Sequence, residues 1–134
     1  MLVFKGFGSL VLPRISKKVS CMSNRTGKDF LSDIQEAMRR VKVHTIGMTY
    51  EAFLADTMTQ DAVVRNLEII GEATKNLSTG LRTRYPDVPW KNLAGVRDRL
   101  IHHYFGVNLD IVWNIVIAEL PDVALQIDEI IRNE

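Results

Sequence analysis

Cysteine is almost absent from this sequence. Cys21 is the single cysteine among 134 residues, so the chain cannot form an internal disulfide. No second cysteine and no histidine lie at metal-ligand spacing from Cys21, so its surroundings do not indicate a metal site. The pattern excludes a disulfide-stapled secreted miniprotein, and a reducing cytoplasm is the location that it favours.

Long apolar runs are also missing. No stretch provides the roughly 20 apolar residues that a membrane-spanning helix needs, so we expect no membrane partner. Hydrophobic residues make up 46% and charged residues 25% of the chain, which is typical of a globular domain and excludes a disordered or collagen-like protein. The length of 134 residues corresponds to one domain.

Acidic residues are missing from the first part of the chain, where Asp29 is the first acid. We interpret residues 1–21 as a leader that is a non-native start or disordered, with Met22 as the favoured initiator. A transit or regulatory segment and an ordered extra element are the alternatives. The domain is then expected over residues 22–134. This part is mildly acidic, so any nucleic acid must be held by a local patch rather than by overall charge, and no DNA partner is expected.

The familiar signatures of many enzymes are absent. The sequence contains no glycine-rich phosphate loop, no GxSxG elbow, no HExxH pair and no aspartate cluster with metal-binding spacing. These absences give no support to a nucleotide-hydrolysing P-loop enzyme, an α/β-hydrolase or a zinc protease. We therefore expect neither a metal nor a cofactor.

Helical periodicity runs through most of the chain from Asp29 onward. The first amphipathic pattern ends at Gly47, and Tyr50 to Leu54 reads as a short helical turn. A second long pattern follows, in which Asn66, Glu68 and Glu72 face away from the apolar stripe. That stripe consists of Val63, Leu67, Ile70, Ala73 or Thr74, and Leu77.

Turn residues separate the later helices. Gly80 and residues 85–89 predict a loop, in which Asp87 is a candidate helix cap and Pro89 lies in the first turn of a third helix that opens at Trp90. This third helix is expected to continue until residues 106–108.

The last helix starts near Asp110 and keeps helical spacing for about six turns, with a kink or break at Pro121. The chain is therefore predicted to be an all-α bundle of roughly four main helices. Surplus apolar residues predict a subunit interface, and hence a homodimer. These residues are Ile69, Ile70, Ile111, Val112, Ile115 and Val116.

The polar residues best suited to catalysis lie at the predicted end of the third helix, where residues 97–104 have the sequence RDRLIHHY. On an ideal helix Asp98 and His102 are neighbours, so the carboxylate can orient the imidazole. Arg97 shares a face with Tyr104, but it diverges from His102 by about 140°. Arg97 and His102 then meet at one substrate only through the length of the arginine, a distortion near Gly106, or apposition of two subunits.

An arginine and a histidine beside one phosphodiester suffice for RNA cleavage without a metal. The histidine accepts the proton of the 2′-hydroxyl, and the arginine neutralises charge on the pentacoordinate phosphorus. A histidine has an ordinary pKa of about 6.5, which suits this proton transfer near neutral pH.

The spacing of Arg97, Asp98, His102 and Tyr104 resembles the motif of the HEPN-type toxin family HepT, also known as DUF86. The resemblance extends over about Asp29 to the C-terminus and leaves out the leader. It rests on the segments RNLEIIGEATKNL, PDVPWKNLAGVRDRLIHHYFGVNLDIVW and LPDVALQIDEII.

This resemblance implies a HEPN-type helical homodimer whose two motif copies face one another across an RNA-cleaving cleft. By the same resemblance Arg97 and His102 are the catalytic pair and Asp98 supports them, whereas His103 has no assigned role. The family implies the toxin of a type VII toxin–antitoxin system that cleaves tRNA or mRNA. Its partner would be an MntA-type nucleotidyltransferase that transfers AMP to Tyr104, and the two proteins could form a higher hetero-oligomer. The adduct would add negative charge where the RNA phosphate must lie.

Two other functions stay open from the residues alone. In one, the protein is a non-catalytic nucleotide-binding or partner subunit of a nucleotidyltransferase; in the other, it is a purely structural dimer. We interpret Glu68 and Glu72 as lining the cleft or pairing with Arg65 and Lys75. His44 is assigned to the helix dipole, and the tryptophans, Trp90 and Trp113, to the core or an interface.

Overall fold

The computed structural model describes residues 24–101 and 106–134, and every regular element in these ranges is a helix. This confirms the predicted all-α fold, while the predicted leader lies outside the described residues. In chain order the elements are α2 (Gly27–Thr45), α3 (Tyr50–Leu54), α4 (Thr57–Lys75), α5 (Thr79–Arg84), α6 (Trp90–Ala94), α7 (Val96–Leu100), α8 (Leu109–Asn114), the π-helical turn η2 (Ile115–Glu119) and α9 (Leu120–Asn133).

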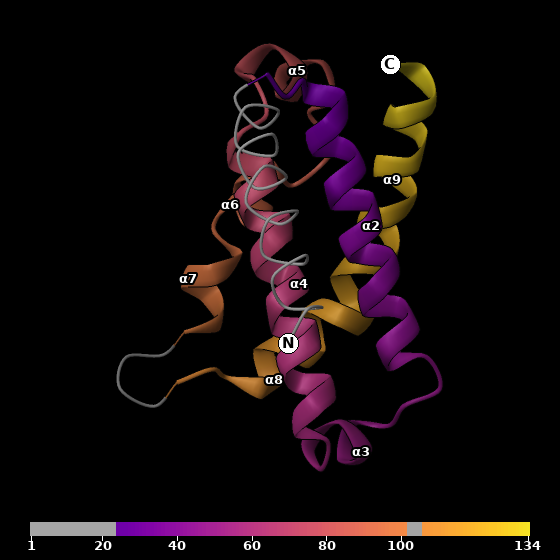
Figure 1. The fold of residues 1–134 in the computed structure, drawn as a ribbon, viewed down its shortest axis with the longest axis vertical. Helices are drawn as coiled ribbons and strands as arrows, with labels where there is room; N and C mark the ends of the chain where they lie inside the picture. Colours follow the sequence, from indigo (N-terminus) through magenta and orange to yellow (C-terminus); the bar gives the residue numbers. More distant parts are fainter. Residues whose placement is uncertain (1–23, 102–105) are drawn as a thin grey trace, which may run out of the picture.

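These described elements form four arms that run alternately up and down (Figure 1). The long helices α2 and α4 are the first two arms, α6 with α7 is the third, and α8, η2 and α9 together are the fourth. Helix α4 is central, because it packs against α2, α3, α6, α7 and α8. The predicted four main helices thus correspond to four arms, of which two are divided into shorter pieces.

Local sequence signals account for both long helices. Thr26 caps α2 in a capping box, since its hydroxyl accepts from the backbone N–H of Asp29 and the Asp29 carboxylate accepts from the N–H of Thr26. Gly47, with φ +72°, follows the end of α2 as predicted. The N-cap of α4 is Asp56, which accepts from the N–H of Thr59 at 3.0 Å.

The apolar stripe predicted for the second pattern is confirmed, because Val63, Leu67 and Ile70 are almost fully buried along α4. The prediction that Asn66 faces away from this stripe was wrong, because Asn66 is buried. Its amide donates to the Ala62 carbonyl at 2.8 Å, which satisfies the polar group within its own helix.

The segment between α4 and α6 contains a short helix, α5, where the sequence predicted only a loop around Gly80. Its N-cap is Ser78, which accepts from the N–H of Leu81 at 3.1 Å. Asp87 does not cap the next helix, contrary to the prediction. The N-cap of α6 is Pro89, which lies before the first turn and makes no side-chain capping bond.

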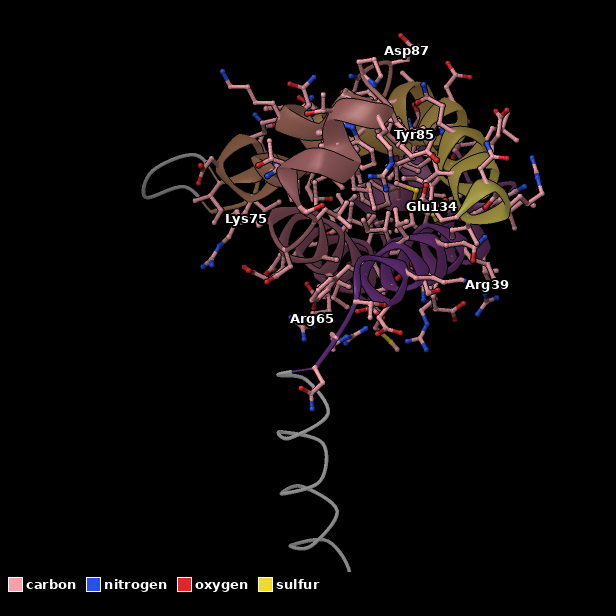
Figure 2. All side chains as sticks on the ribbon, turned by 90° about the horizontal axis from the view of Figure 1, so that it is seen from above. Arg39, Arg65, Lys75, Tyr85, Asp87 and Glu134 are labelled. Carbon is pink, nitrogen blue, oxygen red and sulfur yellow. The ribbon has the colours of Figure 1, made fainter. Side chains whose placement is uncertain are left out.

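Both tryptophans belong to the core, as predicted. Trp90 is buried, and its indole N–H donates to the carbonyls of Tyr85 and Arg82 at 2.8 and 3.1 Å. Trp113 is half-buried and packs against Phe53, with ring centroids 5.1 Å apart. Near the same end as α5, Tyr85 donates to Glu134 at 2.6 Å, and Figure 2 shows the two side chains facing one another.

The fourth arm continues past Pro121 without ending there. A π-helical turn precedes the proline, and the N–H of Leu120 bonds to the carbonyl of Ile115, five residues back. Proline has no N–H and crowds the preceding turn, and a wider turn accommodates it within a continuing helix. The predicted kink therefore takes the form of a π turn.

Four of the six apolar residues predicted to form a subunit interface are buried in the core of the single chain, namely Ile70, Val112, Ile115 and Val116. The prediction that these residues are surplus was wrong, because the fourth arm packs against α4 and α2 and uses its whole inner face. In the described part of the chain, no helix is both long enough and apolar enough to cross a membrane.

Candidate active site

The third predicted helix is divided and ends early. Gly95 separates α6 from α7, and α7 ends at Leu100 rather than at residues 106–108. Ile101 has φ −91° and ψ 125°, which is an extended conformation. The helical spacing that made Asp98 and His102 neighbours therefore does not apply, because the chain leaves the helix between them.

Two of the four predicted site residues lie within the described residues. Arg97 and Asp98 are both exposed on α7. His102 and Tyr104 lie outside the described residues, as does His103. The structure therefore describes the surroundings of Arg97 and Asp98 and of the residues that flank the motif.

The residues on either side of this gap lie next to one another. Ile101 and Val107 form an isolated antiparallel β-bridge, and the N–H of Asn108 donates to the carbonyl of Leu100 at 2.8 Å. Gly106 has φ +77°, a conformation that glycine adopts without steric cost. The end of α7 and the residues that lead into α8 are thus held side by side.

Arg97 lies on a groove of about 360 Å³ between α4, the start of α2 and the α6–α7 arm. Glu68 and Glu72 of α4 line the same groove, in agreement with one of the two roles predicted for them. The other role was wrong, because within the described residues neither glutamate forms an ion pair with Arg65 or Lys75.

A second hollow, also of about 360 Å³, lies further along α4 and is lined by Val107 and Leu109 on the far side of the motif. Arg65 and Glu68 line both hollows. The face of α4 that carries these two residues therefore extends past both flanks of the motif. Arg65 is exposed and projects outward from the bundle (Figure 2).

The guanidinium of Arg97 forms none of the ion pairs or hydrogen bonds found among residues 24–101 and 106–134. It therefore differs from its neighbour Arg99, which is engaged with Glu119. An exposed arginine that has no partner among the described side chains, on the edge of a groove, is available to bind an anion.

Gly71 was not identified from the sequence as important, but it positions the third arm, α6 with α7, which carries Arg97 and is called the motif arm below. A β-carbon at Gly71 would lie 2.9 Å from Cγ1 of Val96 and 3.2 Å from the carbonyl oxygen of Leu93. Only a residue without a side chain lets α4 approach α6 and α7 this closely. The available signal was a glycine inside a long helical pattern, where it is unfavourable without a packing reason.

Metal binding has no support from the described side chains. In the two ranges that the structure describes, no three His, Cys, Asp or Glu residues come together closely enough to hold a metal ion.

A four-arm helical bundle with this motif arm defines a HEPN-type domain. The family model described as "HepT-like: Ribonuclease HepT-like" matches residues 34–130. The chain belongs to this HepT-like family. No solved structure has significant similarity to the chain.

Several curated proteins are similar over most of their length. "Putative RNase MJ0127" of Methanocaldococcus jannaschii is 48% identical over 112 residues, which cover 84% of this chain and 93% of that protein. "Putative RNase TTE0752" of Caldanaerobacter subterraneus subsp. tengcongensis is 41% identical over 110 residues, covering 82% and 98%. "Probable ribonuclease HepT" of Thermococcus cleftensis is 43% identical over 99 residues, covering 74% and 90%.

Proposed function

We propose that residues 22–134 form a metal-independent endoribonuclease, in which Arg97 and His102 act on one phosphodiester of RNA. The observation that carries this proposal is the position of Arg97, which is exposed on a groove and has no partner among the described side chains. The names of the relatives, which describe them as RNases, support the same activity.

The proposed reaction is an intramolecular transesterification. The imidazole of His102 accepts the proton of the 2′-hydroxyl, and the 2′-oxygen attacks the neighbouring phosphorus. The bond to the 5′-oxygen breaks, this oxygen takes up a proton from water, and the hydroxide that remains takes the proton from the imidazolium of His102. The products are a 2′,3′-cyclic phosphate and a 5′-hydroxyl. Arg97 stabilises the additional negative charge on the phosphorane oxygens.

Arg97 is a suitable group for this role on physical grounds. A guanidinium stays charged at any physiological pH and can donate two parallel hydrogen bonds to phosphate oxygens. Asp98, the next residue on α7, is also exposed, and we assign it a supporting role towards the imidazole. Because the helix ends at Leu100, that support rests on the family motif rather than on helical spacing.

The biological setting that we propose follows the family. The protein would be the toxin of a HepT/MntA-type pair that cleaves tRNA or mRNA, and it would act as a homodimer. A nucleotidyltransferase antitoxin would transfer AMP to Tyr104. The phosphate of the adduct would repel the RNA phosphate at a site that depends on the positive charge of Arg97.

The test is incubation of the purified protein with total tRNA and with mRNA in the presence of EDTA. Arg97→Ala and His102→Ala are the test variants, and Arg132→Ala, an exposed arginine at the end of α9, is the matched control. We expect cleavage by the wild type and the control and at least a hundredfold loss in both test variants. Intact mass must first show that Tyr104 is unmodified.

A negative result has a defined meaning. If the unmodified wild type leaves both RNAs uncut, the endoribonuclease proposal is wrong. The alternative, a non-catalytic nucleotide-binding or partner subunit, then predicts that ATP or AMP binds with an affinity that falls in Arg97→Ala. Calorimetry with the same three variants measures that affinity.

A further inference from the structure

The short helix that carries Arg97 is tied to the fourth arm by an ion pair. Arg99 donates from Nη1 to Oε1 of Glu119 at 2.9 Å and from Nη2 to Oε2 at 2.7 Å. Two parallel bonds of this kind are the strongest form of an arginine–carboxylate contact. The side chains are only 35% and 32% exposed, so solvent screens this pair less than a fully exposed one.

Glu119 is the last residue of the π-helical turn. Its φ of −103° differs from the usual helical value of about −63°, and the N–H of the next residue, Leu120, bonds five residues back to Ile115. A π turn holds more residues than an α turn, so it changes the direction of the side chains along the arm. The distortion before Pro121 thus sets the direction in which Glu119 points.

Helix α7 depends on such contacts for its orientation. It has only five residues, too few for a helix to be stable alone. Val96 and Leu100 are buried, and because they are four residues apart they anchor one line along the helix. Backbone contacts of Leu100 and Ile101 hold the end of α7, and the Arg99 side chain adds a contact with the fourth arm, away from the line through Val96 and Leu100.

We propose that Glu119 is a positioning residue for the candidate active site. Through Arg99 it helps to fix the rotation of α7 about its axis, and with it the direction of the Arg97 side chain beside the groove and the position of Ile101, where the chain leaves the helix. The inference rests on the proposed function. It adds a residue that lies far from the motif in sequence.

The ionisation of the pair agrees with this role. Hydrogen bonds from Arg99 lower the pKa of the Glu119 carboxyl below its usual range, although partial burial acts in the opposite direction. The carboxylate also lies 3.5 Å from the amide nitrogen of Asn114, a weaker contact. Arg99 is the charged group that faces Glu119 in the described structure, so the pair stays ionised at neutral pH.

Glu119→Gln tests the inference, because it removes the charge and keeps the shape. Glu36→Gln is the matched control, since Glu36 accepts two similar bonds from Arg39, at 2.9 and 2.7 Å, and a third from Arg40 at 3.1 Å, on the surface of α2 and away from the motif. Arg99→Lys keeps the charge but loses the two-pronged geometry. The double variant Arg99→Glu with Glu119→Arg exchanges the two charges and tests whether the ion pair and the activity are restored.

A positioning role predicts an effect on kcat. We expect Glu119→Gln to lower kcat for RNA cleavage about ten- to a hundredfold, with KM changed less than about threefold, because a displacement of about 1 Å at a reacting group costs this much. Arg99→Lys should show a smaller loss, and the exchanged pair should recover part of it. A Glu119→Gln variant whose kcat equals that of Glu36→Gln would overturn the inference.

Hydrogen exchange provides a measurement that does not depend on activity. The amides of Ile101 and Asn108 donate to Arg97 and Leu100 at the base of the motif segment. Glu119→Gln should speed their exchange at least fivefold relative to Glu36→Gln, and its exchange in α2 should equal that of the wild type. Equal exchange in both variants would overturn the inference.

The two measurements also separate this inference from the proposed function. A wild type that cuts no RNA refutes the function, and the exchange rates of Ile101 and Asn108 still decide whether Glu119 holds α7. If Glu119→Gln does not fold, Arg99→Lys takes its place in both measurements, with the same criterion against the Glu36→Gln control.

Discussion

Gly71 of α4 lies in such close contact with Val96 of α7 that no side chain fits between them. A β-carbon at Gly71 would lie 2.9 Å from Cγ1 of Val96, closer than non-bonded carbon atoms approach, and the carbonyl oxygen of Leu93 would be 3.2 Å away. This contact sets the distance between the central helix and the arm that carries Arg97. The groove that Arg97 shares with Glu72 depends on it.

We predict that Gly71→Ala destabilises the protein and lowers RNA cleavage. Overpacking costs about 2 kcal/mol, and the better helix propensity of alanine returns about 1 kcal/mol, so the free energy of unfolding should fall by about 1 kcal/mol. Urea denaturation and cleavage assays measure the two effects.

Gly80→Ala is the control for this substitution. Gly80 lies in α5, and a β-carbon at this position would meet nothing closer than Ser78 Oγ at 4.0 Å. Here the propensity gain of about 1 kcal/mol acts alone, so stability should rise. Equal effects of Gly71→Ala and Gly80→Ala would show that the contact with Val96 does not constrain the arm.

Arg65→Gln should weaken RNA binding without a large change in kcat. Arg65 is exposed on the face of α4 that lines both hollows beside the motif, so it is placed to contact a phosphate next to the cleaved one. Loss of one phosphate contact lowers the slope of log K against log salt by about 1. Fluorescence anisotropy with a 2′-O-methyl RNA, which cannot be cleaved by attack of the 2′-oxygen, gives this slope, and Arg132→Gln should leave it unchanged.

Asp56→Ala and Asp87→Ala should differ in their effect on stability. Asp56 caps α4 and accepts from both the N–H and the hydroxyl of Thr59, at 3.0 and 2.7 Å, so its loss should cost about 1 kcal/mol. Asp87 is exposed and caps no helix, so its loss should change stability by less than about 0.5 kcal/mol. Thermal denaturation of both variants measures these changes in stability. A larger loss of stability for Asp87→Ala would contradict the assignment of the caps.

The contribution of the Arg99–Glu119 pair to stability should depend on pH. The pKa of Glu119 is lower in the folded protein than its ordinary value of about 4.5, so the folded state favours the ionised carboxylate. The stabilisation is therefore fully present above about pH 5.5 and is lost as the pH falls through the folded pKa. Urea unfolding of the wild type and Glu119→Gln from pH 3 to pH 7 should show a difference that shrinks at low pH. A difference that grows on acidification would contradict this sign.

The long helices were predictable because their signals are local. The apolar residues Leu67 and Ile70 recur at helical spacing, Gly47 adopts the positive φ that ends α2, and Thr49 caps the short helix that was expected from Tyr50. Each signal acts within one or two helical turns, so it can be recognised in a single segment of the sequence. The family resemblance, which the family match confirms, rests on local text of the same kind.

The ends of the motif helix were not predictable in this way. The sequence from Trp90 onward has helical spacing, but the helix is broken at Gly95 and stops at Leu100, because Ile101 pairs with Val107 instead. That pairing joins two residues that lie on either side of residues 102–106 in the sequence. Helical periodicity contains no information about such a return of the chain.

The sequence by itself determined the all-α class, the periodic faces of the two long helices and the residue types of the motif, because these depend on neighbours a few positions apart. The tertiary structure alone decided that Arg97 lines a groove together with Glu72, that Gly71 sets the distance between α4 and the α6–α7 arm, and that Glu119 binds Arg99 across 20 positions of sequence. These relations arise from the packing of separate arms, and no local pattern records which arms will meet.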